Sequence, residues 1–378
     1  MNNKFDYTVI GAGLAGMTAA RLLSDKGYSV LVLEKLSHVG GSVYDYKDES
    51  GVLVHKYGPH IFHTNHKEVF DFLSRFTEWN GYSHRVVAKL TDREIPVPFN
   101  LTALEEVYGG EKAARITEKL KTEFGSDTVS VMKLRDSADE ELKALGELVY
   151  NNVFLYYTMK QWGKKPSEID PKTTERVPVR LSRDDRYFTD VYQGLPTEGY
   201  TEMAKRMLDS ERITVKTSCE NCIELKDGKI FIEGKETDTK VVYTGELDRL
   251  MGYRFGKLPY RTLDFVFETK NVDSYQSRAT VNYTVSEDFT RITEFKKMTL
   301  QKIDGVTTIM KEYPRQYEGK AGEIPYYPVA NPESAELYAK YREEAEKYGL
   351  ILLGRLAEYK YYNMDAVVKR AMELLGEL

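Results

Sequence analysis

The sequence predicts an α/β fold in which a Rossmann-like dinucleotide-binding domain is combined with a helical insertion and an antiparallel β-sheet domain. Three observations support this prediction. A short apolar strand runs into a glycine-rich turn and a helix near the N-terminus, helical patterns occupy the middle of the chain, and short alternating strands follow. A chain of 378 residues is long enough for two or more domains.

The N-terminal unit has the pattern strand, helix, strand. Tyr7 to Ile10 is a short apolar run, and residues 14–26 place apolar side chains at helical spacing before Gly27 ends the helix. Residues 29–33 form a continuous apolar run, which is typical of a parallel strand covered on both faces. The unit therefore predicts the first crossover of a parallel sheet.

The turn between the first strand and the helix has the spacing of a dinucleotide-binding fingerprint. Gly11 allows the tight turn, and Gly13, beside Leu14, lets the main chain approach a pyrophosphate at the helix N-terminus. Gly16 permits close packing of the helix on the strand. Glu34 follows at the end of the second strand, where a carboxylate accepts hydrogen bonds from an adenosine ribose and repels a 2′-phosphate.

A second pair of glycines follows this carboxylate. Gly40, Gly41 and Ser42 lie shortly after Glu34 and Lys35. The spacing resembles that of the two-dinucleotide-binding-domain flavoproteins, in which this turn lies along the diphosphate of FAD. A nicotinamide enzyme has no need of the second turn, so the pattern favours FAD and predicts that the first domain is a Rossmann-like FAD-binding domain.

The remaining chain has two patterns. Between residues 101 and 153 apolar residues recur three and four apart, which predicts a small helical insertion. Later segments alternate in short strands and predict an antiparallel sheet. These are residues 213–216, a hairpin over 223–233 that turns at Asp227-Gly228, and residues 263–268, 279–284 and 307–311. Residues 350–353 form a late apolar strand between two helices, placed to rejoin the N-terminal sheet.

These patterns predict a division into three parts. Residues 1–84 and 330–378 form a discontinuous FAD-binding domain, to which part of 205–260 is a further candidate contribution. Residues 100–165 form the helical insertion. Residues 85–99 and 166–329 form the antiparallel sheet of a substrate domain.

Composition excludes several classes of function. Acidic residues outnumber basic ones by 59 to 54, so the formal net charge of −5 does not favour nucleic acid or an anionic membrane surface. Cys219 and Cys222 are the only cysteines, too few for a disulfide framework. No apolar run approaches the roughly 18 residues of a membrane span. We expect a cytoplasmic protein with no leader, no membrane span, no bound nucleic acid and no metal site.

Eight segments in the same order resemble the UDP-galactopyranose mutase family, and the resemblance covers nearly the whole chain. They are residues 57–64, 157–163, 176–180, 184–188, 282–284, 312–314, 325–328 and 354–365. Eight ordered segments are more specific than any single motif. The resemblance implies an isomerase that interconverts UDP-galactopyranose and UDP-galactofuranose with no net redox change.

The resemblance also implies the chemistry and the partners. FAD is active in its reduced form, with its N5 atom as a nucleophile on the anomeric carbon; UDP leaves and later returns. UDP-galactose is bound in its pyranose and furanose forms. NAD(P)H or another reductant supplies electrons to the flavin, and the chain forms a homodimer.

Positions that match the family's motifs are assigned to three tasks. Catalytic residues are Arg176, Arg291 and His63, and the two arginines also hold the diphosphate, because guanidinium donors fork onto phosphate oxygens. Substrate-binding residues are Tyr157, Trp162, Arg176, Tyr187, Asn282, Arg291, Glu312, Tyr326 and Tyr361. Besides the two glycine turns with Leu14, Glu34, Lys35 and Ser42, FAD contacts His60, Ile61, Arg355, Tyr361, Asn363 and Met364.

Two departures from the family leave another interpretation open. Asn363 stands where family members often carry Asp, and Arg291 follows Asn282 at a spacing one residue shorter than expected. A catalytically idle protein that binds FAD or a UDP-sugar would show normal UDP binding without turnover. The shared glycine pattern also leaves open a flavin amine-oxidase-like enzyme, whose flavin a substrate amine would reduce without UDP.

Overall fold

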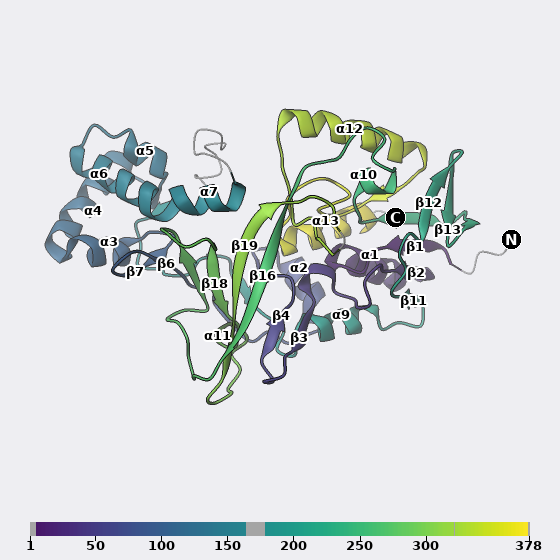
Figure 1. Ribbon diagram of the computed structural model, residues 1–378, viewed down its shortest axis with the longest axis horizontal. Helices are drawn as coiled ribbons and strands as arrows, with labels where there is room; N and C mark the ends of the chain where they lie inside the picture. The colour runs from purple at the N-terminus through teal and green to yellow at the C-terminus, as the bar shows by residue number, and fades with distance from the viewer. Residues whose placement is uncertain (1–4, 164–177, 321, 377–378) are drawn as a thin grey trace.

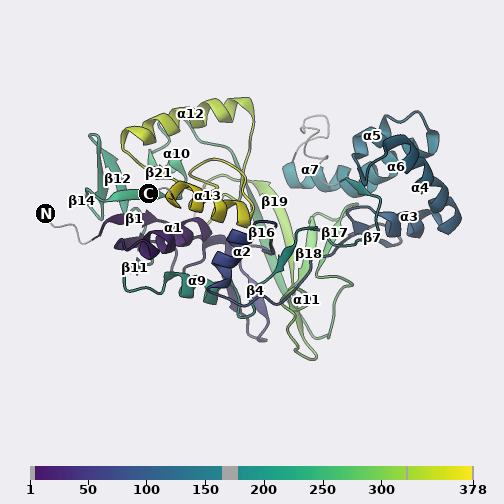
Figure 2. The same cartoon turned by 180° about the vertical axis from the view of Figure 1, so that it is seen from behind.

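The computed structural model describes residues 5–163, 178–320 and 322–376, and Figure 1 shows three regions along its longest axis. A parallel sheet with its helices lies at one end and the helical insertion at the other. A large sheet lies between them, and the view from behind in Figure 2 shows the same order.

The parallel sheet has the strand order β11-β2-β1-β15-β21. Its strands are β1 (Tyr7–Ile10), β2 (Val30–Leu33), β11 (Ile213–Lys216), β15 (Lys240–Tyr243) and β21 (Ile351–Leu352). All four residues of β2 are buried, as its continuous apolar run predicts. Val30 and Val32 join the core under α1 (Leu14–Asp25), α9 (Tyr200–Leu208) and α13 (Met364–Gly376). Leu31 and Leu33 join the opposite core, with α10 (Leu247–Leu250) and α12 (Pro332–Lys347).

Two late segments complete this sheet. β21 pairs in parallel with β15, so the apolar strand near the C-terminus does rejoin the N-terminal sheet. The prediction that residues 213–216 belong to an antiparallel sheet is wrong, because β11 pairs in parallel with β2. The segment alternates buried and exposed residues because β11 is an edge strand, and this alternation resembles that of an antiparallel strand.

The large sheet has the strand order β20-β16-β19-β18-β17-β6-β7. Its strands are β6 (Val86–Lys89), β7 (Glu94–Val97), β16 (Tyr260–Lys270), β17 (Thr280–Tyr283), β18 (Arg291–Glu294), β19 (Thr307–Gln316) and β20 (Tyr327–Pro328). The predicted antiparallel pairing holds except between β6 and β17, which run parallel. The sheet is therefore mixed.

The insertion consists of helices joined by short turns. They are α3 (Leu101–Tyr108), α4 (Gly110–Phe124), α5 (Val131–Arg135), α6 (Glu140–Val149), the π-helical segment η2 (Tyr150–Leu155) and α7 (Tyr156–Trp162). Asn100 and Asp139 cap α3 and α6 by accepting main-chain N–H groups. The core of the insertion includes Val86 and Val97 of the large sheet, so the two regions share one apolar interior.

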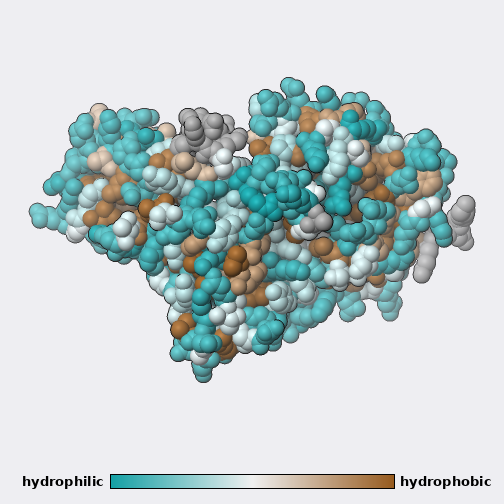
Figure 3. All heavy atoms as spheres, viewed as in Figure 1, coloured by the Kyte–Doolittle hydropathy of each residue, from teal (hydrophilic) through white to brown (hydrophobic). Residues whose placement is uncertain are grey.

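Smaller elements connect these regions. They are η1 (Gly41–Val43), β3 (Asp45–Lys47), β4 (Leu53–His55), β5 (Phe62–Thr64), α2 (Lys67–Ser74), β8 (Thr128–Val129), β9 (Val179–Arg180), β10 (Tyr192–Gly194), β12 (Ile223–Lys226), β13 (Lys229–Ile232), β14 (Lys235–Glu236) and α11 (Phe295–Thr299). The hairpin predicted to turn at Asp227-Gly228 forms between β12 and β13, but it belongs to a separate small sheet. Within the described residues, no helix is long and apolar enough to cross a membrane. On the face in Figure 3, hydrophobic residues form separate small groups among hydrophilic ones.

Candidate active site

A cavity of about 400 Å³ opens at the carboxyl ends of the central parallel strands. Its wall includes the turn after β1, the end of β2 at Glu34, and the end of β15 at Tyr243 and Thr244. The segments around residues 40–43 and 354–364 complete it. Ligands of open α/β sheets bind in this position.

The two glycine turns meet at the floor of the cavity. Gly13 pairs with Gly40 in an isolated bridge, and the Gly40 N–H donates to the Ala12 carbonyl at 2.9 Å. Gly11 has a φ of +101°, and a Cβ on Gly16 would lie 1.9 Å from the Gly11 carbonyl oxygen. A Cβ on Gly13 would meet no atom closer than 3.9 Å. Gly16 therefore serves helix packing, whereas the space beside Gly13 is available to a ligand that contacts the main chain.

The Glu34 carboxylate is fixed at the adenosine end of the cavity. It is buried, and it accepts the Ala12 N–H at 2.5 Å and the Leu36 N–H at 2.8 Å. Each carboxylate oxygen keeps further acceptor capacity, which suits ribose hydroxyl donors and disfavours a 2′-phosphate. Lys35 also lines the cavity, 3.9 Å from the buried Glu246 carboxylate.

The opposite end of the cavity is built by His60 and the segment before α13. Arg355 donates to the Tyr326 carbonyl at 3.0 Å and to the Tyr362 carbonyl at 2.7 Å. Asn363 precedes α13, and its carbonyl accepts the Val367 N–H. The predicted cofactor residues that line the cavity are Gly11, Gly13, Leu14, Glu34, Lys35, Gly40, Gly41, Ser42, His60, Arg355, Asn363 and Met364. Gly16, Ile61 and Tyr361 are not among the residues that line it.

A second site lies on the large sheet, where three polar residues occupy adjacent strands. Asn282 of β17 is directly opposite Arg291 of β18, and Arg291 is directly opposite Glu312 of β19. Arg291 Nε lies 2.7 Å from Glu312 Oε1, the distance of an ion pair, although the two groups lack the alignment of a hydrogen bond. Glu312 is fully buried. The hairpin register thus brings Asn282 and Arg291 together despite their short spacing in the sequence.

Buried acceptors of this cluster lack a hydrogen bond among the described residues, although Glu312 Oε1 lies at ion-pair distance from Arg291. Asn282 Oδ1 and both Glu312 carboxylate oxygens are buried without a hydrogen bond. Such groups are rare in folded proteins, because leaving one unpaired costs about 1–3 kcal/mol. Their concentration in one register row indicates a site that binds a polar ligand.

Tyrosines surround Arg291. Burial acts to lower the pKa of Arg291, but the Glu312 carboxylate, followed by Tyr157 and Tyr327, raises it well above its usual value. Burial raises the pKa of Tyr327 to about 12 and raises the pKa of Tyr157 and Tyr187. The tyrosines therefore stay protonated at neutral pH and can donate hydrogen bonds beside a permanent positive charge.

A stack of three side chains joins the two sites. The Arg355 guanidinium lies 5.6 Å from the Tyr327 ring centroid and 5.1 Å from that of Tyr361, and the two rings stack at 6.2 Å. Tyr326 instead lines the cofactor cavity and contacts Phe265 edge to face. Tyr326 and Tyr327 face different sites because side chains alternate along an extended segment.

Two predicted histidines lie near this junction. His60 Nδ1 is 2.8 Å from the Gly58 carbonyl, and burial, followed by His55, lowers the pKa of His60 to about 3. His63 stacks on Phe188 with centroids 3.6 Å apart, and its Nδ1 is 3.0 Å from Asp190 Oδ2. Asn65 donates to the other oxygen of Asp190 at 2.9 Å, which fixes the carboxylate that orients His63.

Two fully buried histidines make stability dependent on pH. Burial lowers the pKa of His55 and of His84 to about 3, against 6.5 in the unfolded chain. Below pH 6.5 the unfolded chain binds protons that the folded protein does not, so their contribution is present above pH 6.5 and is lost as the pH falls towards 3. We expect the unfolding free energy to fall by about 1.4 kcal/mol for each histidine between pH 8 and 5.5.

Urea unfolding at the two pH values measures this dependence. The variant His84→Gln retains hydrogen-bonding capacity towards the Tyr82 hydroxyl, which lies 3.0 Å from His84 Nδ1, and removes one titrating group. Its unfolding free energy should fall less on acidification than that of the unmodified protein. An equal loss in both proteins would show that His84 is not kept neutral in the folded state.

The remaining predicted residues are placed as follows. Tyr157 and Trp162 lie on α7, partly buried, and Tyr187 lies in the segment before β10. Arg176 lies outside the described residues. The sequence analysis missed Tyr327, His84 and Asp190. Tyr327 follows the predicted Tyr326 in the sequence, but the sequence pattern does not show which of the two faces Arg291. His84 and Asp190 lie outside the segments that resemble the family.

The fold and the sites together define a class of protein. A cavity with two glycine turns and a ribose-binding carboxylate is characteristic of dinucleotide-binding proteins. Beside it, a partly buried arginine lies among protonated tyrosines, a combination whose donors suit an anionic group. The fold and the cavity thus define a dinucleotide-dependent protein.

Comparison with known proteins gives the family. The model of the UDP-galactopyranose mutase family matches residues 152–361, and that of an NAD(P)-binding Rossmann-like domain matches residues 9–76. A probable UDP-galactopyranose mutase of Klebsiella pneumoniae is 34% identical over 100% of this chain and 95% of its own length. A dTDP-fucopyranose mutase of Escherichia coli is 33% identical over 97% of this chain and 96% of its own length. The chain belongs to the UDP-galactopyranose mutase family.

The fold agrees with this membership. A crystal structure of a reduced UDP-galactopyranose mutase matches with a TM-score of 0.74 and 16% identity, covering 99% of this chain and 95% of that one. A human flavin-containing amine oxidase B is 39% identical over only 18% of this chain, so the amine-oxidase alternative reflects a distant relation. The protein is a flavin-dependent mutase, and the cavity with the two glycine turns fits FAD.

Proposed function

We propose that the protein interconverts UDP-galactopyranose and UDP-galactofuranose, with the nucleotide-sugar bound on the large sheet beside the flavin. One observation carries this proposal. The row of Asn282, Arg291 and Glu312 combines buried acceptors that lack a hydrogen bond with a permanent cation, and the stack of Tyr327, Arg355 and Tyr361 connects it with the cofactor cavity. A sugar diphosphate offers hydroxyl donors to the acceptors and phosphate oxygens to the cation.

Each group of residues has a task in this proposal. Arg291, together with Arg176, holds the diphosphate, and the hydroxyls of Tyr187, Tyr327 and Tyr361 donate to it. Tyr157 and Trp162 on α7 stack on the base. The residues that line the cavity would hold FAD, which in its reduced form would supply an electron pair for the displacement of UDP at the anomeric carbon. The arginines keep the released UDP close, so that its return competes with diffusion.

Turnover in the two redox states tests the proposal. Protein reduced with dithionite should convert UDP-galactofuranose to UDP-galactopyranose, and oxidised protein should do so poorly, as measured by chromatographic separation of the two nucleotides. Equal activity in the oxidised protein would contradict a reaction that requires reduced FAD. UDP binding without conversion would instead support a catalytically idle binding protein.

The choice of nucleotide-sugar is tested in parallel, because a relative of similar identity is named for dTDP-fucopyranose. The same assay with the dTDP-linked sugar should give a lower kcat/KM than with UDP-galactose. A higher kcat/KM with the dTDP-linked sugar would indicate that a thymidine nucleotide-sugar is the substrate.

Further parts of the proposal follow from the family. Residues 1–84 and 330–378 form the FAD-binding domain, residues 100–165 the helical insertion, and residues 85–99 and 166–329 the substrate domain. β11 and β15 are exceptions: they pair within the parallel sheet and are assigned to the FAD-binding domain. NAD(P)H or another reductant reduces the flavin in the cytoplasm, and the chain acts as a homodimer. Candidate reductants are compared by the loss of flavin absorbance that accompanies reduction. The homodimer is tested by measuring the mass in solution by light scattering.

A further inference from the structure

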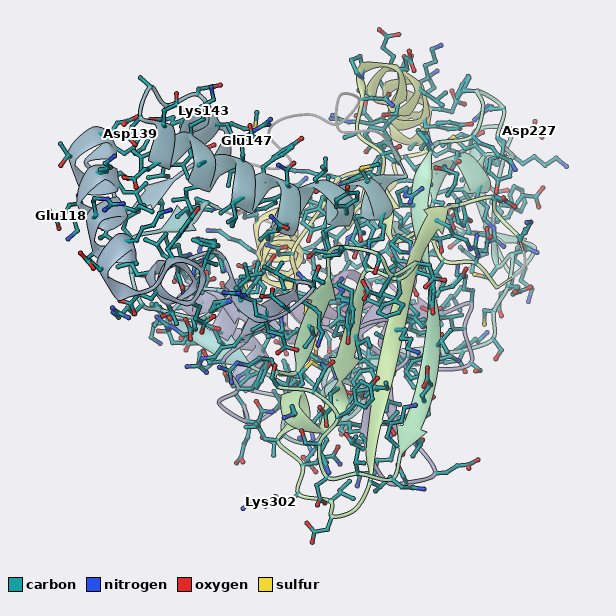
Figure 4. The ribbon with its side chains drawn as sticks, turned by 60° about the vertical axis from the view of Figure 1, so that its left-hand side comes forward. Glu118, Asp139, Lys143, Glu147, Asp227 and Lys302 are labelled. Atoms are coloured by element: carbon teal, nitrogen blue, oxygen red, sulfur yellow. The ribbon has the colours of Figure 1, made fainter. Side chains whose placement is uncertain are left out.

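The helix that carries Tyr157 and Trp162 reaches the large sheet from the insertion. Figure 4 shows α6, where Lys143 and Glu147 are labelled, continuing through η2 into α7, which ends beside the top of that sheet. α7 contacts β19 there. The aromatic residues of α7 and the polar row around Arg291 therefore come from two different parts of the fold, and their relative position has to be fixed.

Lys160 of α7 makes a contact suited to this task. Its Nζ donates to three main-chain carbonyls, those of Tyr283 at 2.6 Å, Glu287 at 2.9 Å and Phe289 at 3.0 Å. The Tyr283 carbonyl is at the end of β17, and the other two belong to the turn between β17 and β18, the strands that carry Asn282 and Arg291. An ammonium group has three N–H donors, so this turn satisfies all of them.

Arg261 holds the end of the same helix. It is buried on β16, and its Nε donates at 3.1 Å to the carbonyl of Gln161, in the last turn of α7. The last carbonyls of a helix lack partners within the helix and carry partial negative charge, so a guanidinium is stabilising there. A Cβ on Gly163 would lie 3.1 Å from Arg261 Nη1, which shows how closely the helix end approaches this side chain.

We propose that Lys160 and Arg261 are positioning residues that fix α7 against the β17–β18 turn, and thereby set the distance between the base-binding aromatics and the diphosphate-binding arginine. The inference rests on the proposed function, in which the aromatic residues of α7 bind the base and Arg291 of β18 binds the diphosphate of the same nucleotide. Lys160 affects substrate binding only by setting the relative positions of Tyr157, Trp162 and Arg291. It belongs to neither the polar row nor the cofactor cavity.

The test is the variant Lys160→Met, which keeps most of the apolar stem and removes the three donors. We expect the dissociation constant of UDP, measured by calorimetry on the FAD-bound protein, and the KM to rise about tenfold, because hydrogen bonds from a charged group contribute to this alignment. The kcat at saturation should change by less than about threefold, because binding restores the alignment before the chemical step. Lys160→Arg retains charge and donors and should recover most of the affinity.

Lys296 provides a matched control. Lys296 is buried, whereas Lys160 is partly buried, and Lys296 likewise donates to main-chain carbonyls, those of Ile303 at 2.5 Å and Val306 at 2.7 Å. The turn that it holds contains Lys302, which Figure 4 shows at the opposite end of the sheet from α7. Lys296→Met should lower the urea midpoint of unfolding comparably and leave the UDP affinity and KM within about twofold of the unmodified protein.

The possible results separate the two proposals. A Lys160→Met variant with unchanged UDP affinity and KM would overturn the positioning role, as would an equal rise in KM in Lys296→Met. Should Lys160→Met fail to bind FAD or fold, Arg261→Met, which removes the other contact that holds α7, provides the same comparison. An unmodified protein that fails to bind UDP would contradict the proposed function itself.

Discussion

Replacement of Arg291 by Met should lower kcat/KM by about 10³-fold while FAD remains bound. Arg291 supplies the partly buried cation of the polar row, and one charge-assisted donor aimed at developing charge contributes about 3–4 kcal/mol to turnover. The same change leaves the Glu312 carboxylate fully buried without a counter-ion. We therefore also expect the unfolding free energy to fall by about 3–5 kcal/mol.

A double variant separates these two effects. Arg291→Met combined with Glu312→Met replaces both charges of the buried pair with apolar groups of similar size, which is often neutral for stability. The double variant should regain most of the unfolding free energy but none of the turnover. Urea unfolding and steady-state kinetics measure the two quantities on the same preparations.

Lys311→Met is a matched control on the adjacent residue of β19. Lys311 is about as exposed as Arg291, but it forms an ion pair at 2.6 Å with Glu268, a carboxylate that is partly exposed where Glu312 is fully buried, and removal of such a pair costs at most about 1 kcal/mol. Its kinetics should remain within about threefold of the unmodified protein. An Arg291→Met variant that retains kcat/KM within tenfold would remove Arg291 from the substrate site.

The variant Gly13→Ala should fold normally and lose FAD affinity by at least about 100-fold. Gly13 has a φ of −76°, which alanine adopts without strain, and its Cβ would meet no protein atom closer than 3.9 Å. In the holoenzyme the same methyl group would occupy the space through which the pyrophosphate approaches the main chain. Calorimetric titration of FAD-free protein measures the loss.

Gly16→Ala is the contrasting change in the same turn. Its Cβ would lie 1.9 Å from the main-chain oxygen of Gly11, so the helix has to move away from the strand. We expect its unfolding free energy to fall by about 3 kcal/mol, whereas that of FAD-free Gly13→Ala changes by less than about 1 kcal/mol. Full retention of FAD by Gly13→Ala would show that the pyrophosphate lies elsewhere.

The cofactor site could be predicted from the sequence because its determinants are local. Gly11, Gly13 and Glu34 belong to one strand-helix-strand unit, whose spacing fixes their relative positions. Residues far along the chain, such as Arg355 and Asn363, could be placed only through the family resemblance. Ile61 and Tyr361 were assigned to FAD in the same way, yet they do not line the cavity, since a matching motif does not fix the direction of each side chain.

The substrate site was predicted less completely because it depends on strand register and side-chain direction. Arg291 could be named, but only the pairing of β17, β18 and β19 shows that it lies between Asn282 and Glu312. Tyr326 was predicted to bind substrate; it lines the cofactor cavity, and its neighbour Tyr327 is the tyrosine that interacts with Arg291. The assignment of residues 213–216 failed for a related reason, because an edge strand of a parallel sheet alternates like an antiparallel one.

Segments that are far apart in the sequence, around residues 11–14 and 354–364, line the same cavity, and this has a consequence for biosynthesis. The ribosome makes the turn at Gly11 to Gly16 first, whereas β21, Arg355 and Asn363 emerge only after the insertion and the large sheet. A nascent chain can therefore bury much of its apolar surface before it can retain a flavin. Acquisition of FAD therefore comes late in maturation, after residues 354–364 have been synthesised.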